Sequence, residues 1–307
     1  MKSRLNTIGI FYFRSCLKDT IMGDNQKLNV TIQGVEGCYH DAAAREYFKD
    51  TAIETIPCDS FPHMFERLES DASLIGIMAI ENTIAGSLLQ NHELLRKSNH
   101  IIVGEHKMRI SHVLAACPGQ SIDTLYEVDS HPMALMQCEA YIRQHPNLKM
   151  TEKFDTAGSA REIAENNLTG HAAICGEYAA GIYGLEILAR EIETNKRNFT
   201  RFLILADPLL APELRPKEEQ LDKSSIMFTL PHSRGALSKV LTIFSFYDIN
   251  LSKIQSMPIM GREWEYRFYI DLTFDSYHRY RQSIDAVRPL INDFKILGEY
   301  VECRNEV

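Results

Sequence analysis

A serine, a histidine and a cysteine occur together in the stretch DSHPMALMQC, residues 129–138, and these side chains serve in nucleophilic catalysis. Pro132 suits the first turn of a helix but not its interior, and an apolar run follows it. We therefore expect a helix with Ser130 as its N-cap. Cys138 then falls inside an apolar helix, where a cysteine is usually a small core residue. Ser130 and Gln137 lie two turns apart, about 10 Å along the axis, so both can face one cleft.

A second group of polar side chains, Glu81, Asn82 and Thr83, directly follows the apolar run SLIGIMAI. Such a run is typical of a buried strand, and ligands of open α/β sheets bind beyond the carboxyl ends of strands. Asn82 and Thr83 supply neutral groups suited to a hydroxyl or a carboxylate, while Glu81 could exchange a proton if its pKa were raised. The alternative is an Asx-type turn that caps the next helix and has no role in chemistry.

Thr200 and Arg201 form a third group, in the stretch NKRNFTRFLIL, where a basic segment precedes a strongly apolar strand. In an acidic chain this segment is a candidate subsite for a carboxylate, because a guanidinium group can pair with one through two hydrogen bonds. A solvated run of charges is the alternative. Earlier in the chain, Gly34 and Gly37 permit a tight turn that could hold an anion, or that simply joins a strand to a helix.

An α/β domain must position these groups, since short β-like runs alternate with helix-like stretches from residue 28 to 206. We expect a largely parallel sheet there. Residues 207–223 hold three prolines among charged residues, which indicates a linker. Residues 224–303 then follow the order βαββαβ, a ferredoxin-like arrangement, in which a helix from Gly235 to about Phe246 carries one apolar stripe.

The overall composition narrows the class of protein. A length of 307 residues with 45% hydrophobic content indicates a globular chain with two or three domains. The net charge of -8 and the pI near 5.8 argue against the basic surface that nucleic-acid binding requires. The seven cysteines show no C-x-x-C pair and the 11 histidines no H-E-x-x-H motif, so we expect a cytoplasmic setting and no metal. No apolar run approaches the ~20 residues that span a bilayer.

The first residues stand apart from this pattern, and we expect residues 1–27 to be a disordered extension. An apolar patch at residues 8–13 superficially resembles a signal peptide, but the patch is short, Arg14 follows it and no A-x-A cleavage site appears. Met22 offers a second plausible start, so the sequence does not decide between Met1 and Met22.

Five ordered motifs, spread over about residues 28 to 300 together with the C-terminal module, resemble those of prephenate dehydratase. The family's patterns are G-P-x-G-[TS], E-N-[ST]-x-x-G, S-H-P-x-A-L-x-Q-C, D-T-A and N-x-T-R-F. In this chain the corresponding stretches are Gly34–Cys38, which matches imperfectly, Glu81–Gly86, Ser130–Cys138, Asp155–Ala157 and Asn198–Phe202. Five motifs in the expected order are far more specific than any one of them.

The resemblance implies a bilobal catalytic domain, similar to periplasmic binding proteins, that converts prephenate to phenylpyruvate without a cofactor. It gives Thr200 the role of a hydroxyl aimed at the leaving group. The implied substrate-binding residues are Glu81, Asn82, Thr83, Ser130, Gln137 and Arg201. No residue decides between prephenate and its amino analogue arogenate, and the bare sequence also admits a non-enzymatic bilobal amino-acid-binding or sensor protein.

The C-terminal residues 224–303 resemble an ACT regulatory domain of the kind that binds phenylalanine. The resemblance implies feedback regulation by L-phenylalanine, bound between paired domains of a homodimer or homotetramer. The implied binding residues are Gly235, Ala236, Leu237, Asn250 and Leu251. The usual E-S-R-P motif is QSMP here, residues 255–258, so a charge pair that helps to organise that region is absent. The strength and sign of the regulation therefore stay open.

Overall fold

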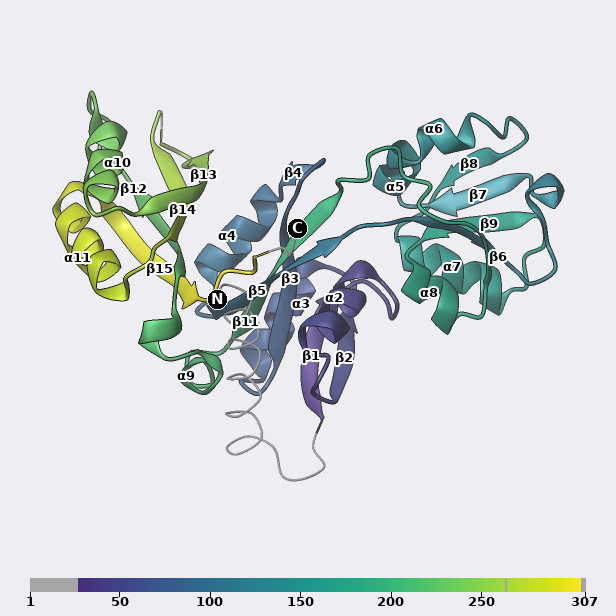
Figure 1. Ribbon diagram of the computed structural model, residues 1–307, viewed down its shortest axis with the longest axis horizontal. Coiled ribbons are helices and arrows are strands. Elements are labelled where there is room, and N and C mark those ends of the chain that lie inside the picture. The colour runs from purple at the N-terminus through teal and green to yellow at the C-terminus, as the bar shows by residue number, and fades with distance from the viewer. Residues whose placement is uncertain (1–26, 263, 305–307) are drawn as a thin grey trace.

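The structure is a computed structural model that describes residues 27–304 with the exception of Glu263. The predicted disordered extension falls, apart from Lys27, outside the described residues. Figure 1 shows three parts in a row: a C-terminal domain in yellow and green, a central lobe in purple and blue, and a second lobe in teal. A ten-stranded sheet runs through the first two parts and a five-stranded sheet through the third. Within the described range no helix is long and apolar enough to cross a membrane.

The central lobe is built on strands with the order β5-β11-β3-β1-β2. β1 is parallel to β2 and β3, but β11 is antiparallel to both of its neighbours. The sheet is therefore mixed rather than largely parallel, because β11 returns from the second lobe instead of following a crossover helix. The elements are β1 (Leu28–Gln33), α2 (Tyr39–Tyr47), β2 (Ile53–Cys58), α3 (Phe61–Ser70), β3 (Ile75–Asn82), β4 (Gly86–Ser87), α4 (Leu89–Lys97), β5 (Ile101–Arg109) and β11 (Phe199–Ala206).

The second lobe carries the sheet β10-β6-β9-β7-β8. The chain enters it through residues 110–112, after β5, and leaves it through residues 190–198, before β11. These two crossings lie side by side, since the Ile110 amide donates to the Asn198 carbonyl at 2.7 Å. The elements are β6 (Val113–Ala116), η1 (Ile122–Thr124), β7 (Glu127–Ser130), α5 (Pro132–Gln137), α6 (Glu139–Ile142), β8 (Lys149–Glu152), α7 (Thr156–Glu165), β9 (His171–Cys175), α8 (Glu177–Ile182) and β10 (Glu186–Ala189).

The predicted helix after residue 130 exists, but its first residues differ from the expectation. α5 begins at Pro132, and its N-cap is His131, whose Nδ1 accepts from the Met133 amide at 3.2 Å. Ser130 is not the N-cap, because it is the last residue of β7 and pairs with β8. Cys138 is fully buried in the core of the second lobe, which confirms its predicted core position.

The C-terminal domain has the predicted βαββαβ order, with strands arranged β13-β14-β12-β15. Its first helix begins after Gly235, which adopts φ +74°, and buries Val240 and Phe244 as the apolar stripe predicts. The elements are β12 (Lys223–Thr229), α10 (Ala236–Phe246), β13 (Asn250–Pro258), β14 (Tyr266–Thr273), α11 (Tyr277–Val287), η3 (Arg288–Leu290) and β15 (Asn292–Tyr300).

The predicted linker, residues 207–223, is packed against the body of the protein. It contains the short helices α9 (Ala211–Leu214) and η2 (Glu218–Gln220), and Ala211 and Leu214 belong to the hydrophobic cluster that the two lobes share. The linker therefore holds the C-terminal domain close instead of acting as a loose tether.

The junction between the central lobe and the C-terminal domain is a continuous sheet. β15 pairs with β5 in parallel, with Gly298 opposite Ile102. A Cβ at Gly298 would lie only 2.2 Å from the Ile102 carbonyl oxygen, so a side chain at this position would push the strands apart. Apolar side chains of both parts, such as Leu203 and Tyr269, share one core cluster beneath the junction.

Candidate active site

Thr200 and Asn82 lie opposite each other at the ends of the antiparallel strands β11 and β3. The Asn82 amide Nδ2 donates to Thr200 Oγ1 at 3.0 Å. Asn82 Oδ1 accepts from the backbone amides of Ile84 and Ala85, each at 2.8 Å, and this pair of bonds fixes which way the amide points. The Asx-type turn considered as an alternative role is therefore present, and it also orients the group that binds Thr200.

The Asn82 amide starts a chain of hydrogen bonds that ends in the second lobe. Asn82 Nδ2 also donates to Asn198 Oδ1 at 2.8 Å, and Asn198 Nδ2 donates to Gln137 Oε1 at 2.9 Å. Gln137 Oε1 lies 3.0 Å from His112 Nε2, and His112 Nδ1 lies 2.8 Å from the Tyr39 hydroxyl. These hydrogen bonds join β3, the two crossings and α5. We call their residues the cleft network, after the cleft that the sequence predicts there: Thr200, Asn82, Asn198, Gln137, His112 and Tyr39.

The direction of these bonds determines the proton positions on His112. Gln137 Oε1 is an acceptor from Asn198, so it must also accept from His112, which places a proton on Nε2. Burial lowers the pKa of His112, outweighing the hydrogen bond to Gln137 and the charge of Glu193, so the ring is neutral at pH 7. The Tyr39 hydroxyl oxygen lies 2.8 Å from both His112 Nδ1 and the Ser111 carbonyl oxygen, so these two acceptors share its single proton.

Two atoms of this network remain available to a ligand. The oxygen of Thr200 accepts from Asn82, while no described residue accepts the Thr200 hydroxyl proton. Gln137 Nε2 likewise has no partner among the described residues, since its carbonyl oxygen makes the two bonds above. The sequence motifs therefore led to Thr200, Asn82 and Gln137, whereas His112 and Tyr39 were missed because no local pattern marks them.

Two predicted substrate-binding residues act instead within the protein. Ser130 is fully buried, and its hydroxyl donates to the Ile174 carbonyl at 2.6 Å, so it has no free group to offer a ligand. Thr83 is exposed, but its hydroxyl donates to the Arg197 carbonyl at 2.9 Å and accepts from the Phe199 amide at 2.9 Å. It therefore ties the end of β3 to the crossing that leads into β11.

Comparisons with known proteins agree with this arrangement. Residues 30–208 match the family model of prephenate dehydratase. Arogenate dehydratase/prephenate dehydratase 2 of Arabidopsis thaliana is 36% identical over 292 residues, covering 91% of this chain and 74% of that protein. The chain belongs to the prephenate dehydratase family.

Solved structures of this family share the fold. Prephenate dehydratase from Arthrobacter aurescens, solved in complex with L-Phe, is 27% identical with a TM-score of 0.78, covering 89% of this chain and 90% of that one. A protein described as a novel type of quorum quenching acylase has the same identity and TM-score, covering 90% and 98%. The bilobal fold, similar to periplasmic binding proteins, is thereby confirmed for this member of the prephenate dehydratase family.

Glu81 and Arg201, which the family's motifs also contain, point away from the cleft network. Arg201 is 6% exposed, and its guanidinium binds Glu105 Oε2 at 2.6 Å, Glu81 Oε1 at 3.1 Å and Asp271 Oδ2 at 2.5 Å. Both side chains lie on the opposite face from Thr200 and Asn82, because alternate residues of a strand face opposite sides. Their role in substrate binding stays a prediction that these contacts do not support. Both residues belong to the junction with the C-terminal domain.

The protonation state of Glu81 follows from the same contacts. Burial would raise its pKa, but Lys253, whose Nζ lies 2.7 Å from Glu81 Oε2, and Arg201 outweigh that effect and lower the pKa. Glu81 is therefore an ionised member of an ion-pair cluster and not a proton donor.

The predicted phenylalanine-binding residues lie at both ends of α10. Gly235 precedes the helix, Ala236 and Leu237 form its first turn, and Asn250 and Leu251 begin β13 after its other end. The 11 residues of α10 span about 16 Å. One phenylalanine cannot contact both groups within a single copy of the chain.

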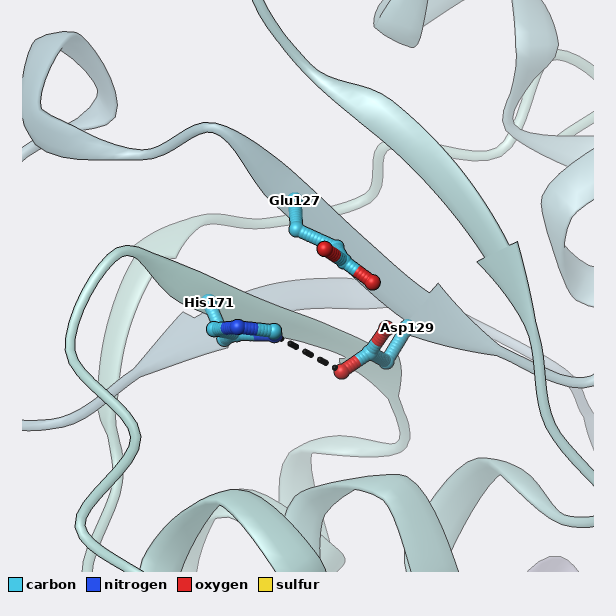
Figure 2. A group of neighbouring side chains, drawn as sticks. All are labelled: Glu127, Asp129 and His171. Atoms are coloured by element: carbon cyan, nitrogen blue, oxygen red, sulfur yellow. Dashed lines mark hydrogen bonds and ion pairs between the residues drawn. The ribbon is translucent and has the colours of Figure 1, made fainter.

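One cluster in the second lobe has the residue types of a cation site. Figure 2 shows Glu127 and Asp129 on β7 facing His171 on β9, and their ligand atoms lie within 4.8 Å of one another. His171 Nδ1 is 3.1 Å from Asp129 Oδ2, and Glu127 Oε1 accepts from Thr151 at 2.6 Å. The prediction that the protein uses no metal stays a prediction.

Proposed function

We propose that this chain is a lyase that converts prephenate to phenylpyruvate, with loss of carbon dioxide and of the ring hydroxyl. The observation that carries this proposal is the Thr200 hydroxyl, whose oxygen is held by Asn82 and whose proton is free for a ligand. The membership in the prephenate dehydratase family supports it independently.

The reaction requires one proton and the correct orientation of the substrate. The bond from the ring to its carboxylate breaks and the electron pair enters the ring, while the C–O bond breaks and the hydroxide takes a proton to leave as water. Thr200 supplies that proton and regains one from solvent. The N–H of Asn82 stabilises the negative charge that develops on Thr200 Oγ1, an arrangement that costs no reorganisation during the reaction. Positioned proton donation contributes about 10²- to 10⁴-fold.

The same geometry explains how two lobes act together. Gln137 belongs to α5 of the second lobe and Thr200 to β11 of the central lobe, and Asn198 joins them. A substrate that binds Gln137 Nε2 and the Thr200 hydroxyl therefore contacts both lobes. Orientation of this kind is worth several powers of ten in rate.

Arogenate is a second candidate substrate. It carries an ammonium group in place of the keto oxygen of prephenate, and the cleft network is neutral, so no described charge there selects one over the other. Relatives such as arogenate dehydratase 1 of Petunia hybrida, 36% identical over 292 residues, bear the name of this activity. Parallel assays with both compounds decide the preference.

Regulation by phenylalanine belongs to the same proposal. The C-terminal domain acts as an ACT domain, in which the start of α10 from one copy and the start of β13 from a second copy bind L-phenylalanine in a homodimer or homotetramer. The separation of Gly235 and Asn250 by the length of α10 supports two copies, and the Arthrobacter aurescens prephenate dehydratase was solved in complex with L-Phe. We also place the protein in the cytoplasm, which the six described cysteines, all free, support.

The test is turnover by a valine variant of Thr200, which removes the hydroxyl and keeps the shape of the side chain. Thr200→Val lowers kcat for prephenate by about 100-fold or more, since the proton donor is lost. Thr31→Val is the matched control, because Thr31 is a fully buried threonine of the same sheet, on β1 beyond β3, that bonds Cys58 outside the cleft network. An inactive wild type would support the sensor-protein alternative, and equal kcat in wild type and Thr200→Val would overturn the mechanism.

A further inference from the structure

The strand pair that carries the catalytic hydroxyl also carries the main ion pair of the domain junction. In the register of β3 and β11, Thr200 lies opposite Asn82 and the next residue, Arg201, lies opposite Glu81. Thr200 and Asn82 belong to the cleft network, whereas Arg201 and Glu81 face the C-terminal domain. No residue separates the two functions along either strand, so a displacement of one pair moves the other.

The C-terminal domain supplies a large share of the contacts of Arg201. Asp271 Oδ2 on β14 accepts from Arg201 Nη1, and the Tyr300 hydroxyl on β15 lies 3.0 Å from Nη2. Glu105 on β5 accepts from Nε at 2.6 Å and also binds Lys223 Nζ of β12 at 3.0 Å. Four acceptors thus fix the guanidinium group, two of them from beyond the junction.

The acceptors on the C-terminal side are themselves held. Ser225 Oγ donates to Asp271 Oδ1 at 2.5 Å and lies 2.6 Å from the Tyr300 hydroxyl. Asp271 and Tyr300 are 6% and 0% exposed, so both are almost closed to solvent. Buried charge pairs of this kind are strong and directional, and one left without its partner is costly.

We infer that Arg201 is a positioning residue, through which Asp271 of the C-terminal domain sets the place of Thr200 and Asn82 in the cleft. Within the described part of the chain, the Arg201 guanidinium bonds only residues of the junction, so it acts on the cleft network through the strand. The kinetic test of this inference rests on the proposed function. Its structural test rests only on the geometry of the junction.

The kinetic test is Asp271→Asn, which keeps the size of the side chain but removes its charge. We expect kcat to fall by about 10- to 100-fold, because misplacement of a reacting group by about 1 Å has effects of this size. KM stays within about twofold, since Gln137, which also binds the substrate, lies on α5 and not on the displaced strands. If Asp271→Asn does not fold, Ser225→Ala is the substitute, because it removes only the hydrogen bond to Asp271 Oδ1. We expect kcat to fall in this variant too.

The matched control is Glu93→Gln, which removes a different charge from the same domain junction. Glu93 on α4 binds Arg267 Nη1 at 3.2 Å and the Tyr269 hydroxyl at 2.9 Å, both on β14, but has no contact with β11. We expect the control to keep its kcat within about twofold. An equal loss of kcat in Glu93→Gln and Asp271→Asn, or no loss in Asp271→Asn, would overturn the inference.

A second readout separates this inference from the proposed function. In Asp271→Asn the backbone amides of residues 196–202 exchange hydrogen with solvent faster than in wild type, and in Glu93→Gln they do not. If the wild type turns over neither prephenate nor arogenate, the proposed function fails, while a selective exchange increase still supports the coupling. Unchanged exchange in Asp271→Asn would overturn it.

Discussion

The cleft network and the ion pairs of the domain junction, here called the junction cluster, meet on successive residues of β3 and β11, yet they differ in chemistry. The cleft network consists of amides, hydroxyls and a neutral imidazole, with bonds of 2.8–3.0 Å, and its Gln137 Oε1 accepts from both Asn198 and His112. The junction cluster consists of full charges, with Arg201 and Lys223 against Glu105 and Asp271. The neutral groups can exchange hydrogen bonds with a substrate, whereas the charged groups hold a fixed geometry.

Charge explains this difference, because residues of both groups are buried. Buried charges that have lost water are held strongly only while every partner is present, so they serve best where nothing needs to move. Neutral hydrogen bonds cost less to exchange, and a ligand can replace water among them. The ion pairs of Arg201 on one face of β11 fix the position of the strand. On the other face, the Thr200 hydroxyl proton stays available to a ligand.

The largest effect is expected from Glu105→Gln. Glu105 is 4% exposed and accepts from Arg201, from Lys223 and from the Cys303 amide. A glutamine removes the negative charge and turns two N–H donors toward groups that are donors themselves, so the free energy of unfolding falls by about 3–5 kcal/mol. Urea unfolding followed by circular dichroism measures this change. If Glu105→Gln lowers the free energy of unfolding no more than Glu93→Gln does, the prediction that this cluster contributes more than the rest of the junction fails.

A charge placed in the cleft network is expected to affect catalysis more than stability. Asn198→Asp replaces the Nδ2 donor by an oxygen that faces Gln137 Oε1, so the hydrogen bond between these residues is lost and two acceptors face each other. We expect kcat to fall by about 100-fold, with a smaller loss of unfolding free energy than in Glu105→Gln. Steady-state kinetics and urea unfolding of the same sample measure both. The matched control is Asn166→Asp at the exposed end of α7, and equal kcat in the two variants would contradict the prediction.

The smallest effect concerns pH. His112 has a pKa below its usual value because of burial, so the unfolded chain binds the proton more readily. Its contribution to stability is present above pH ~6.5 and declines as pH falls below that value. Asp271 has a pKa lowered to about 2, because Arg201 and Lys223 outweigh its burial, so the junction keeps its charges until far lower pH.

The corresponding measurement is the melting temperature between pH 7.5 and 5.5. We expect it to fall with pH in wild type and to fall less steeply in His112→Gln. The slope does not vanish, because burial also lowers the pKa of His40, His92 and His100. A steeper slope in His112→Gln would show that the imidazole is protonated in the folded protein.

Local sequence patterns were sufficient for the domain order and for part of the site. The βαββαβ order and the core position of Cys138 followed from apolar periodicity, and Asn82, Gln137 and Thr200 followed from the motifs. The orientation of Arg201 could not be predicted, because it depends on β15 extending the sheet beyond β5, a contact between residues about 200 positions apart.

Ser130 illustrates a second limit. Its place before Pro132 suited an N-cap, but the boundary between β7 and α5 falls one residue later, and this turns the hydroxyl toward Ile174. His112 and Tyr39 lie 73 positions apart and meet only because the first crossing passes α2. No spacing rule along the chain contains that information.

The continuous sheet has a consequence for anyone who dissects the molecule. A chain ending near residue 208, where the family match stops, would expose β5 as an edge strand and leave Arg201 and Glu105 without their C-terminal partners. An open edge of this kind is a template for pairing with other chains. We therefore expect the isolated catalytic segment to self-associate when it is expressed. In the full chain the C-terminal domain prevents this, because β15 covers the edge of β5.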